Sequence, residues 1–142
     1  MTLPPTNAFR HLLEILPTDI DELGHVNNVV YLRWVQEASA RHWEELADEE
    51  TRKNFAWVVL RHEIDYNYPA DQNDSIHVLT WVGQTEGVRS QRHVNIYNAS
   101  NRLLASACTT WCMIDAHSGK PRKIEDKVLK MLLNSGVIVN HS

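Results

Sequence analysis

The sequence is poor in the residues that mark several specialised classes of protein. It contains two cysteines, five glycines and five prolines in 142 residues, and no stretch approaches the ~18 consecutive apolar residues that span a membrane. Lys and Arg number 14 against 18 Asp and Glu, for a net charge of −4. This balance argues against binding to nucleic acid or to an anionic membrane surface. No basic segment followed by an apolar one precedes residue 20, so we expect a cytoplasmic protein.

Metal and redox chemistry are also not indicated. Cys108 and Cys112 lie four residues apart in a strand-like segment, which separates their α-carbons by roughly 13 Å, too far for a disulfide. The eight histidines include no HxH or HxxxH pair, and no Cys–His spacing is typical of zinc sites. We therefore predict two small buried thiols, no metal ion and no redox cofactor.

Hydrophobic periodicity predicts one long helix that begins at Asn27 or Asn28. Apolar and small residues recur there at spacings of three and four, namely at Val29, Leu32, Val35, Ser39, His42 and Leu46, with Val30, Tyr31, Trp34 and Ala38 widening the same face. The polar run EELADEE follows, so we expect burial over the first half of the helix. The other predicted elements are a strand at 9–16, strands at 55–68, 75–83, 87–98 and 102–115, and a C-terminal helix at 124–136 that ends at Gly136.

This order of elements predicts an α+β fold in a single domain, residues 1–142. The last three strands are joined by hairpin-length connections, which favours an antiparallel meander. There are too few helices for the crossovers of a parallel sheet. The prediction is a curved antiparallel sheet of five or six strands wrapped around one long helix. Such a layer leaves sheet edges uncovered, so we expect a dimer that extends the sheet.

The segment DIDELGHVNN, residues 19–28, concentrates the candidate chemistry. Asp21 precedes the predicted helix by six or seven residues, and the chain bends at Gly24. A carboxylate can thus lie near the exposed N–H groups of the first helical turn, which stabilise negative charge on a carbonyl oxygen. That pair suits the hydrolysis of an acyl compound. The alternative is that these residues only turn the chain and cap the helix, and we assign that role to Asp19.

The run from Asp21 to Tyr31 resembles the active-site segment of the hotdog-fold acyl-thioester hydrolases. It is similar to the 4-hydroxybenzoyl-CoA thioesterase branch and to the acyl-ACP thioesterases, in which HVNN followed by a tyrosine recurs. The segments EIDYNYPA, TWVG and SGKPRKI also resemble the corresponding regions, so that the resemblance covers roughly residues 8–130. It implies the hotdog fold and the hydrolysis of acyl-CoA or acyl-ACP, with CoA or phosphopantetheine as part of the substrate.

The resemblance also implies roles for individual residues. Asp21 matches the catalytic carboxylate, as nucleophile or general base, and the N–H near Asn28 matches the oxyanion donor. His25 matches a histidine with a catalytic or orienting part, although Leu23 replaces the Asn that often accompanies it. Asn27 and Tyr31, within the same motif, are expected to contact the substrate. An active site between the subunits of a homodimer, or of a tetramer of dimers, is implied.

Other polar residues have weaker assignments. His62 and Tyr66 share a strand face with Leu60 and Ile64, so they line either an acyl pocket or the core. The basic residues fall into two groups, with Lys120, Arg122 and Lys123 as candidates for the phosphates of the carrier, and Arg89, Arg92 and Arg102 expected on the surface.

Two alternative functions remain at this point. One is a non-catalytic module that binds acyl thioesters or lipids without turnover. The other is a hydratase or dehydratase on the same fold. The hydratase motif resembles D-x-N-x-x-H, with the histidine five residues after the aspartate, whereas His25 follows Asp21 by four. The register therefore favours the thioesterase.

Overall fold

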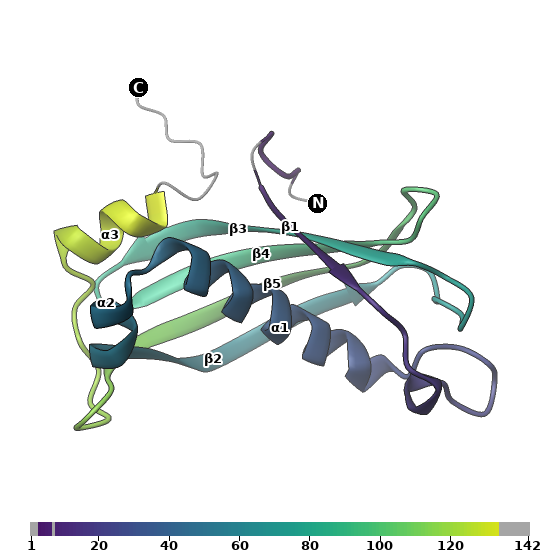
Figure 1. The fold of residues 1–142 in the computed structure, drawn as a ribbon, viewed down its shortest axis with the longest axis horizontal. Coiled ribbons are helices and arrows are strands. Elements are labelled where there is room, and N and C mark those ends of the chain that lie inside the picture. Colours follow the sequence, from purple (N-terminus) through teal and green to yellow (C-terminus); the bar gives the residue numbers. More distant parts are fainter. Residues whose placement is uncertain (1–2, 7, 134–142) are drawn as a thin grey trace.

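The computed structural model describes residues 3–6 and 8–133. Its elements are β1 (Phe9–Leu13), the short 3₁₀ helix η1 (Pro17–Asp19), α1 (Asn28–Leu46), α2 (Glu49–Asn54), β2 (Phe55–Tyr66), β3 (Ile76–Glu86), β4 (Arg89–Tyr97), β5 (Leu103–Asp115) and α3 (Asp126–Leu133). Figure 1 shows α1 lying along one face of the sheet, with α2 and α3 together at one end.

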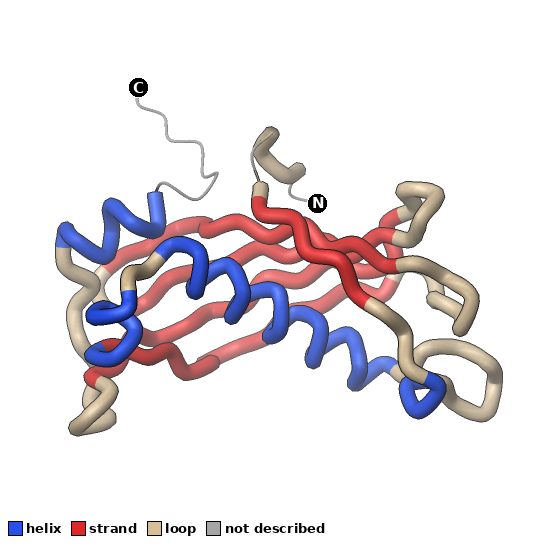
Figure 2. Tube along the Cα trace, in the orientation of Figure 1, coloured by secondary structure: helices blue, strands red, loops and turns tan. Residues whose placement is uncertain are grey.

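The sheet has five strands in the order β1-β3-β4-β5-β2, and every neighbouring pair is antiparallel. The β3-β4-β5 meander is as predicted, with β2 and β1 added at its two edges. Figure 2 shows that the long helix rests on a single sheet and that the described helices lie on the same side of it. The predicted α+β architecture, a curved antiparallel sheet around one long helix, is confirmed.

Helix α1 begins at Asn28, and the side chain of Asn27 caps it by accepting a hydrogen bond from the Val29 N–H. The buried face consists of Val30, Tyr31, Trp34, Val35, Ala38, Ser39 and His42. Val29 was expected on that face, but it is 66% exposed. On a helix of 3.6 residues per turn, three residues rotate by about 300°, so each step of three residues falls about 60° short of a full turn around the axis. The predicted stripe therefore drifts, and Val29 falls outside the sector that meets the sheet.

Several boundaries differ from those predicted. The polar run after α1 holds a second helix, α2, which Asp48 caps by accepting a hydrogen bond from the Thr51 N–H. Strand β1 ends at Leu13, before the predicted end at residue 16. Helix α3 begins at Asp126, and its predicted end at Gly136 lies outside the described residues. Within the described part of the chain, no helix is long and apolar enough to cross a membrane.

A β-bulge at Leu60 changes which side chains of β2 face α1. Val59 pairs with Trp111 and Arg61 with Thr110, so Leu60 has no partner of its own in β5. Such an extra residue shifts the alternation of faces by one position. Leu60 is 48% exposed and lies with polar residues of the opposite sheet face. It therefore does not share a face with His62, contrary to the sequence prediction.

The interior contains two apolar clusters. The larger lies beneath the first half of α1 and includes Trp34, Val35 and Ile96. The smaller packs beneath α3 and includes Met113 and Val128. Polar side chains lie between them on the helix-facing side of the sheet, at positions Thr80, Ser90, Arg92, Thr109 and His62.

Candidate active site

The segment before α1 forms a tight hairpin that holds the candidate residues. Ile20 pairs with Val26, the Asn27 N–H donates to the Asp19 carbonyl at 2.9 Å, and the Asp21 N–H donates to the His25 carbonyl at 2.8 Å. Gly24 completes the turn with φ of +80°, a conformation that other residues adopt only under strain. Asp21 and His25 thus sit opposite each other. Roughly 10 Å of backbone separates this level from Asn28.

Asp19 supports this hairpin from below. Its carboxylate accepts two hydrogen bonds from the Arg33 guanidinium, at 3.0 and 3.1 Å, and one from the Leu16 N–H at 2.9 Å. Burial raises the pKa of Asp19, but the hydrogen bonds from Arg33 and Leu16 outweigh it and hold the pKa below its usual value. Asp19 is only 2% exposed. It therefore ties η1 to α1, in keeping with the turn role assigned to it.

Asp21 is exposed, and only one of its two carboxylate oxygens accepts hydrogen bonds from the described residues. Its Oδ1 accepts hydrogen bonds from the N–H groups of Leu23 at 2.9 Å and His25 at 3.1 Å. Among the described residues, none donates a hydrogen bond to Oδ2. The backbone thus orients the side chain through one oxygen, and the other oxygen accepts no hydrogen bond from the described residues. His25 is half-buried, and its backbone pairs with Asp71.

The start of α1 leaves one backbone donor unpaired. The Asn27 side chain accepts from the Val29 N–H at 3.2 Å, and the Asn27 carbonyl accepts from the Val30 N–H at 2.9 Å. The Asn28 N–H has no acceptor within the described structure, and Asn28 is exposed. No acidic residue lies in the first turn. An unpaired N–H at the positive end of a helix suits a carbonyl oxygen that gains negative charge.

Tyr66 and Tyr31 connect the helix start to the rest of the fold. The Tyr66 hydroxyl donates to the Asn28 carbonyl at 3.0 Å, which ties the last residue of β2 to the first of α1. The Tyr31 ring is buried, and its hydroxyl accepts from the Ala70 N–H at 3.0 Å. The two rings meet edge to face, with centroids 5.3 Å apart. The structure thus brings Asp21, His25, Asn27, Asn28, Tyr31 and Tyr66 into one region.

His62 lies apart from this group. It is four residues before Tyr66 on the same strand, a distance of about 13 Å, and its Nδ1 is 2.8 Å from the Thr109 hydroxyl. Burial lowers the pKa of His62. It belongs to the polar positions between the two apolar clusters, so any contact it makes with a substrate occurs away from the hairpin.

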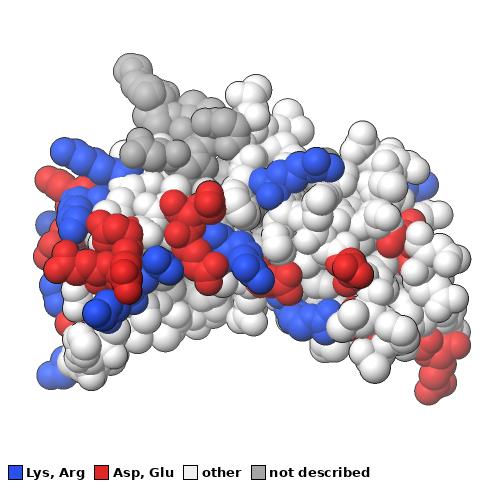
Figure 3. Space-filling view, in the orientation of Figure 1, with Lys and Arg blue, Asp and Glu red and all other residues white. Residues whose placement is uncertain are grey.

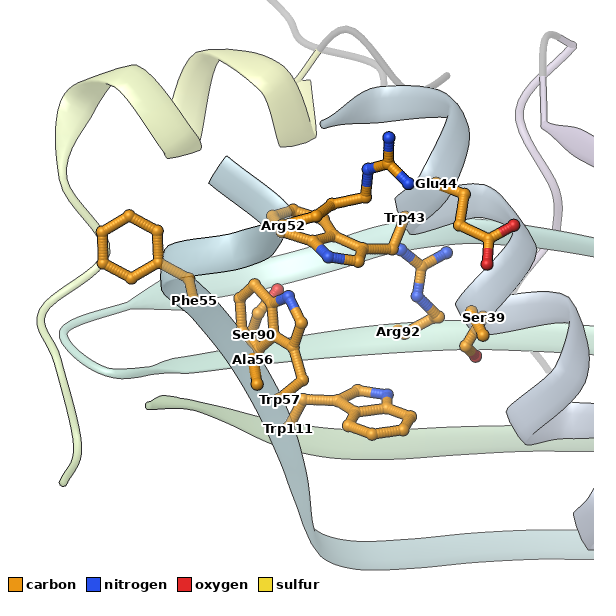
Figure 4. Close-up of a pocket in the computed structure, with 11 residues that line it drawn as sticks. Ser39, Trp43, Glu44, Arg52, Phe55, Ala56, Trp57, Ser90, Arg92 and Trp111 are labelled. Atoms are coloured by element: carbon orange, nitrogen blue, oxygen red, sulfur yellow. The ribbon is translucent and has the colours of Figure 1, made fainter. Parts of the chain in front are cut away.

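A cavity of about 350 Å³ opens beneath the second half of α1. Trp43, Trp57 and Trp111 surround it, and Arg92 enters it from β4 (Figure 4). Arg92 was expected on the surface, but it is only 6% exposed. The signal was present in the sequence, because Arg92, Val94 and Ile96 alternate along β4 and therefore share the buried face.

His42 completes this cluster. The Arg92 guanidinium donates through Nη1 to His42 Nδ1 at 2.7 Å and to the Thr80 hydroxyl at 3.1 Å. Burial and the neighbouring Arg92 charge lower the pKa of His42 to about 3. The imidazole is therefore neutral at physiological pH, and its Nδ1 is an acceptor. The Phe9 ring stacks on it at 4.8 Å.

The charged surface is uneven. In Figure 3 acidic and basic side chains gather at the α2 and α3 end, and fewer charged side chains are visible at the opposite end. Arg122, a candidate for a carrier phosphate, already pairs with Asp115 at 2.9 Å and Glu125 at 3.6 Å. Lys120 and Lys123 are exposed. Over residues 3–6 and 8–133, no group of three or more His, Cys, Asp or Glu side chains is placed to hold a metal ion.

Comparison with known families bears directly on this geometry. The sequence model of the acyl-ACP thioesterase N-terminal domain matches residues 6–132, which is most of the chain. The chain belongs to this family. It is a thioesterase, and the hotdog fold expected from the motif is the fold it adopts.

Relatives and solved structures extend this result. The thioesterase is 28% identical over 121 residues to the long-chain acyl-CoA thioesterase FadM of Escherichia coli (strain K12), covering 80% of this chain and 88% of FadM. A thioesterase superfamily structure from Jannaschia sp. CCS1 superposes with a TM-score of 0.88 at 18% identity, covering 95% and 97% of the two chains. A thioesterase from Thermus thermophilus, complexed with coenzyme A and Zn, gives 0.78 at 21% identity and 89% and 93% coverage.

Proposed function

We propose that this thioesterase hydrolyses acyl-CoA to a free acid and CoA, with Asp21 as the reactive carboxylate and the Asn28 N–H as the oxyanion donor. One observation carries the proposal. The helix begins with an unpaired N–H, and an exposed carboxylate with one free oxygen lies on the hairpin immediately before it.

The proposed reaction needs only these groups and water. The thioester carbonyl oxygen accepts a hydrogen bond from the Asn28 N–H, which stabilises the negative charge that develops there. Asp21 Oδ2 takes a proton from water while the water oxygen bonds to the carbonyl carbon. The C–S bond then breaks, its electron pair leaves with sulfur, and the proton passes to the thiolate. His25, on the opposite side of the hairpin, orients the water or the substrate.

Direct attack by Asp21 is the other form of this mechanism. It would give a mixed anhydride between Asp21 and the acyl group, which water then opens. A single turnover in heavy-oxygen water detects direct attack when water opens the anhydride at the Asp21 carbonyl carbon. Unlabelled oxygen passes from Asp21 to the product only if the carboxylate itself attacks.

A second subunit is part of the proposal. Strand β2 has 12 residues and lies at an edge of the sheet, whereas β1 at the other edge has five. A long edge strand with exposed Val58 and Leu60 invites pairing with another strand. Antiparallel pairing of two β2 strands about their midpoint would place the Phe55 end of one copy against the Tyr66 end of the other. The cavity of one subunit would then open beside Asn28 of its partner.

Acyl-CoA is the proposed substrate because of what the relatives bind or cleave. FadM is a long-chain acyl-CoA thioesterase, and the Thermus thermophilus structure contains coenzyme A. Exposed Lys120 and Lys123 follow β5, whose last residue pairs with Phe55, and so lie near the cavity end of β2. Their charge would suit the phosphates of CoA.

A thiol-release assay over aryl-CoA, alkyl-CoA and acyl-ACP substrates tests the function. We expect turnover of acyl-CoA substrates, and faster turnover of these than of the same acyl groups on ACP. Tight binding of acyl-CoA without release of thiol from any substrate would instead show a binding module. Faster turnover on ACP would overturn the choice of carrier.

A further inference from the structure

Arg92 is a buried cation for which the described residues supply no negative partner. It is 6% exposed, and its two hydrogen bonds both leave from Nη1 and go to neutral acceptors, His42 and Thr80. No carboxylate of the described chain forms an ion pair with it. Burial lowers the pKa of Arg92 to about 10, so the guanidinium is still charged at neutral pH. A buried charge left with neutral neighbours is costly.

A second buried donor lines the same cavity. The indole Nε1 of Trp111 is buried and has no hydrogen-bond partner. The two serine hydroxyls of the cavity are already engaged, because Ser39 donates to the Val35 carbonyl at 2.7 Å and Ser90 bonds to the Thr85 hydroxyl at 2.7 Å. Arg92 and Trp111 thus offer hydrogen-bond donors to the cavity, and no described residue accepts a hydrogen bond from Trp111 Nε1 or forms an ion pair with Arg92.

The rest of the cavity is apolar. Trp43 and Trp57 form walls, and Figure 4 shows them beside the space that Arg92 enters. The charged rim consists of Glu44 and Arg52, both exposed and one of each sign. The cavity volume of about 350 Å³ falls within the range of about 300–1,000 Å³ seen for small-molecule sites. The walls therefore suit an apolar body, and the interior suits one anionic group.

We propose that this cavity binds the acyl group of the substrate, and that Arg92 with Trp111 selects acyl groups carrying a carboxylate at the end remote from the thioester. A full negative charge matches a buried guanidinium, whereas a hydroxyl or keto oxygen leaves the charge uncompensated. The substrate class is thus the CoA monothioester of a dicarboxylic acid. This assignment rests on the proposed function for the position of the thioester.

The separation of the two sites fits this arrangement. Ser39 follows Asn28 by 11 residues on α1, which is about 16 Å along the helix axis. The larger apolar cluster fills the space between them within one subunit. In the proposed dimer the acyl group would instead pass from Asn28 into the cavity of the partner subunit.

The first test compares two substrates that differ only at the remote end, a medium-chain dicarboxylic monothioester of CoA and the unsubstituted acyl-CoA of equal length. We expect the wild-type enzyme to have the higher kcat/KM for the carboxylated substrate. R92M is expected to lower that value by about 10- to 100-fold and to change the value for the unsubstituted substrate by less than about threefold. R41M is the matched control, since it removes an exposed cation of α1 that does not line the cavity.

Trp111 is tested by the same pair of substrates. W111F removes one N–H and keeps most of the aromatic wall, so we expect a loss of about threefold to tenfold confined to the carboxylated substrate. W34F is the control, because the Trp34 Nε1 is also buried without a partner but does not line the cavity. An equal effect of W111F and W34F on both substrates would assign Trp111 to packing alone.

Binding provides a readout that does not need turnover. Thioether analogues of the two substrates cannot be hydrolysed, and the tryptophans of the cavity report their binding by fluorescence. We expect the carboxylated analogue to bind wild-type enzyme at least tenfold more tightly than the other, and R92M to abolish that difference. If this holds while no thioester is hydrolysed, the site stands and the proposed function fails.

The opposite results overturn the proposal. Hydrolysis of both substrates with no preference in wild-type enzyme and no binding difference between the analogues would retain the thioesterase and remove the carboxylate site. Arg92-dependent binding of a free monocarboxylic acid, without any preference among thioesters, would assign the cavity to the released product. If R92M does not fold, the wild-type comparison of the two analogues still decides.

Discussion

The two ends of α1 offer hydrogen-bond donors in opposite ways. At the N-terminal end the donor is the backbone N–H of the exposed residue Asn28, and the exposed Asp21 lies on the hairpin that precedes the helix. Beneath the second half of the helix the donors are the side chains of Arg92 and Trp111, which line a cavity. A backbone donor exists whatever the residue type, whereas side-chain donors depend on particular residues. The first end is thus suited to a reaction shared by a family, and the second to discrimination among substrates.

The largest effect on activity is expected from D21N, on the hairpin before the N-terminal end of α1. The amide neither accepts a proton from water nor attacks the thioester, so kcat should fall by roughly 1,000-fold, about 4 kcal/mol in barrier. Both the carboxylated and the unsubstituted acyl-CoA should lose activity equally. Steady-state thiol release measures this, with E22Q as the control because Glu22 is an exposed acid on the same hairpin. Turnover of D21N within tenfold of wild type would remove Asp21 from the reaction.

The next effect tests whether the two ends cooperate across subunits. L60D would place carboxylates near the midpoint of two paired β2 strands, where like charges repel. We expect dissociation of the dimer and a loss of activity of about 10- to 100-fold at a concentration where wild type is dimeric. L12D is the matched control, because Leu12 is 66% exposed on the edge strand β1. Light scattering measures the oligomeric state, and thiol release measures the activity. A monomer that stays fully active would show that the N-terminal end of α1 does not need the cavity of a second subunit.

The buried His42, which accepts a hydrogen bond from Arg92 beneath the second half of α1, should make the stability of the protein depend on pH. Burial and the Arg92 charge lower the pKa of His42 from 6.5 to about 3, so the unfolded chain binds a proton that the folded chain excludes. Stability is therefore full above pH 6.5 and falls as the pH drops toward 3, by up to ~1.4 kcal/mol per pH unit.

H42Q removes this proton uptake, and its amide oxygen can still accept from Arg92. Urea unfolding between pH 5 and 7 should give a flatter profile for H42Q than for wild type. H117Q is the control, because His117 is exposed. Parallel profiles for H42Q and wild type would show that His42 is not held neutral by the fold.

Sequence patterns predicted the N-terminal start of α1 more fully than the cavity beneath its second half. The helix start was predicted at Asn27 or Asn28, and Asn28 is where it begins, because capping is local chemistry within a few residues. The extra residue at Leu60 was not predicted, since a bulge depends on pairing with β5, some 50 positions away. Arg92 was assigned to the surface from its charge, although its alternation with Val94 indicated burial. Its partner His42 comes from a different element, and periodicity within one segment carries no information about such pairs.

The smallest effect is expected at the contact between the last residue of β2, Tyr66, and the first residue of α1, Asn28. Y66F removes the hydrogen bond to the Asn28 carbonyl, and because Tyr66 is 43% exposed water replaces much of that bond, so stability should fall by only ~0.5 kcal/mol. The Asn28 carbonyl lies in the peptide unit that follows the one carrying the donor N–H, so the first residue of α1 would be held less firmly, and we expect kcat to fall about threefold with little change in KM.

Y68F is the matched control for this prediction. Tyr68 is also 43% exposed, and its ring stacks under the Arg102 guanidinium at 3.5 Å, a contact that phenylalanine retains. Thermal unfolding and steady-state kinetics on the same two substrates measure both variants. If Y66F acted by loosening the oxyanion donor, the carboxylated and unsubstituted substrates would lose kcat alike. A loss confined to one of them would place Tyr66 in the acyl site, and so join the two ends of α1 that the structure of one subunit keeps apart.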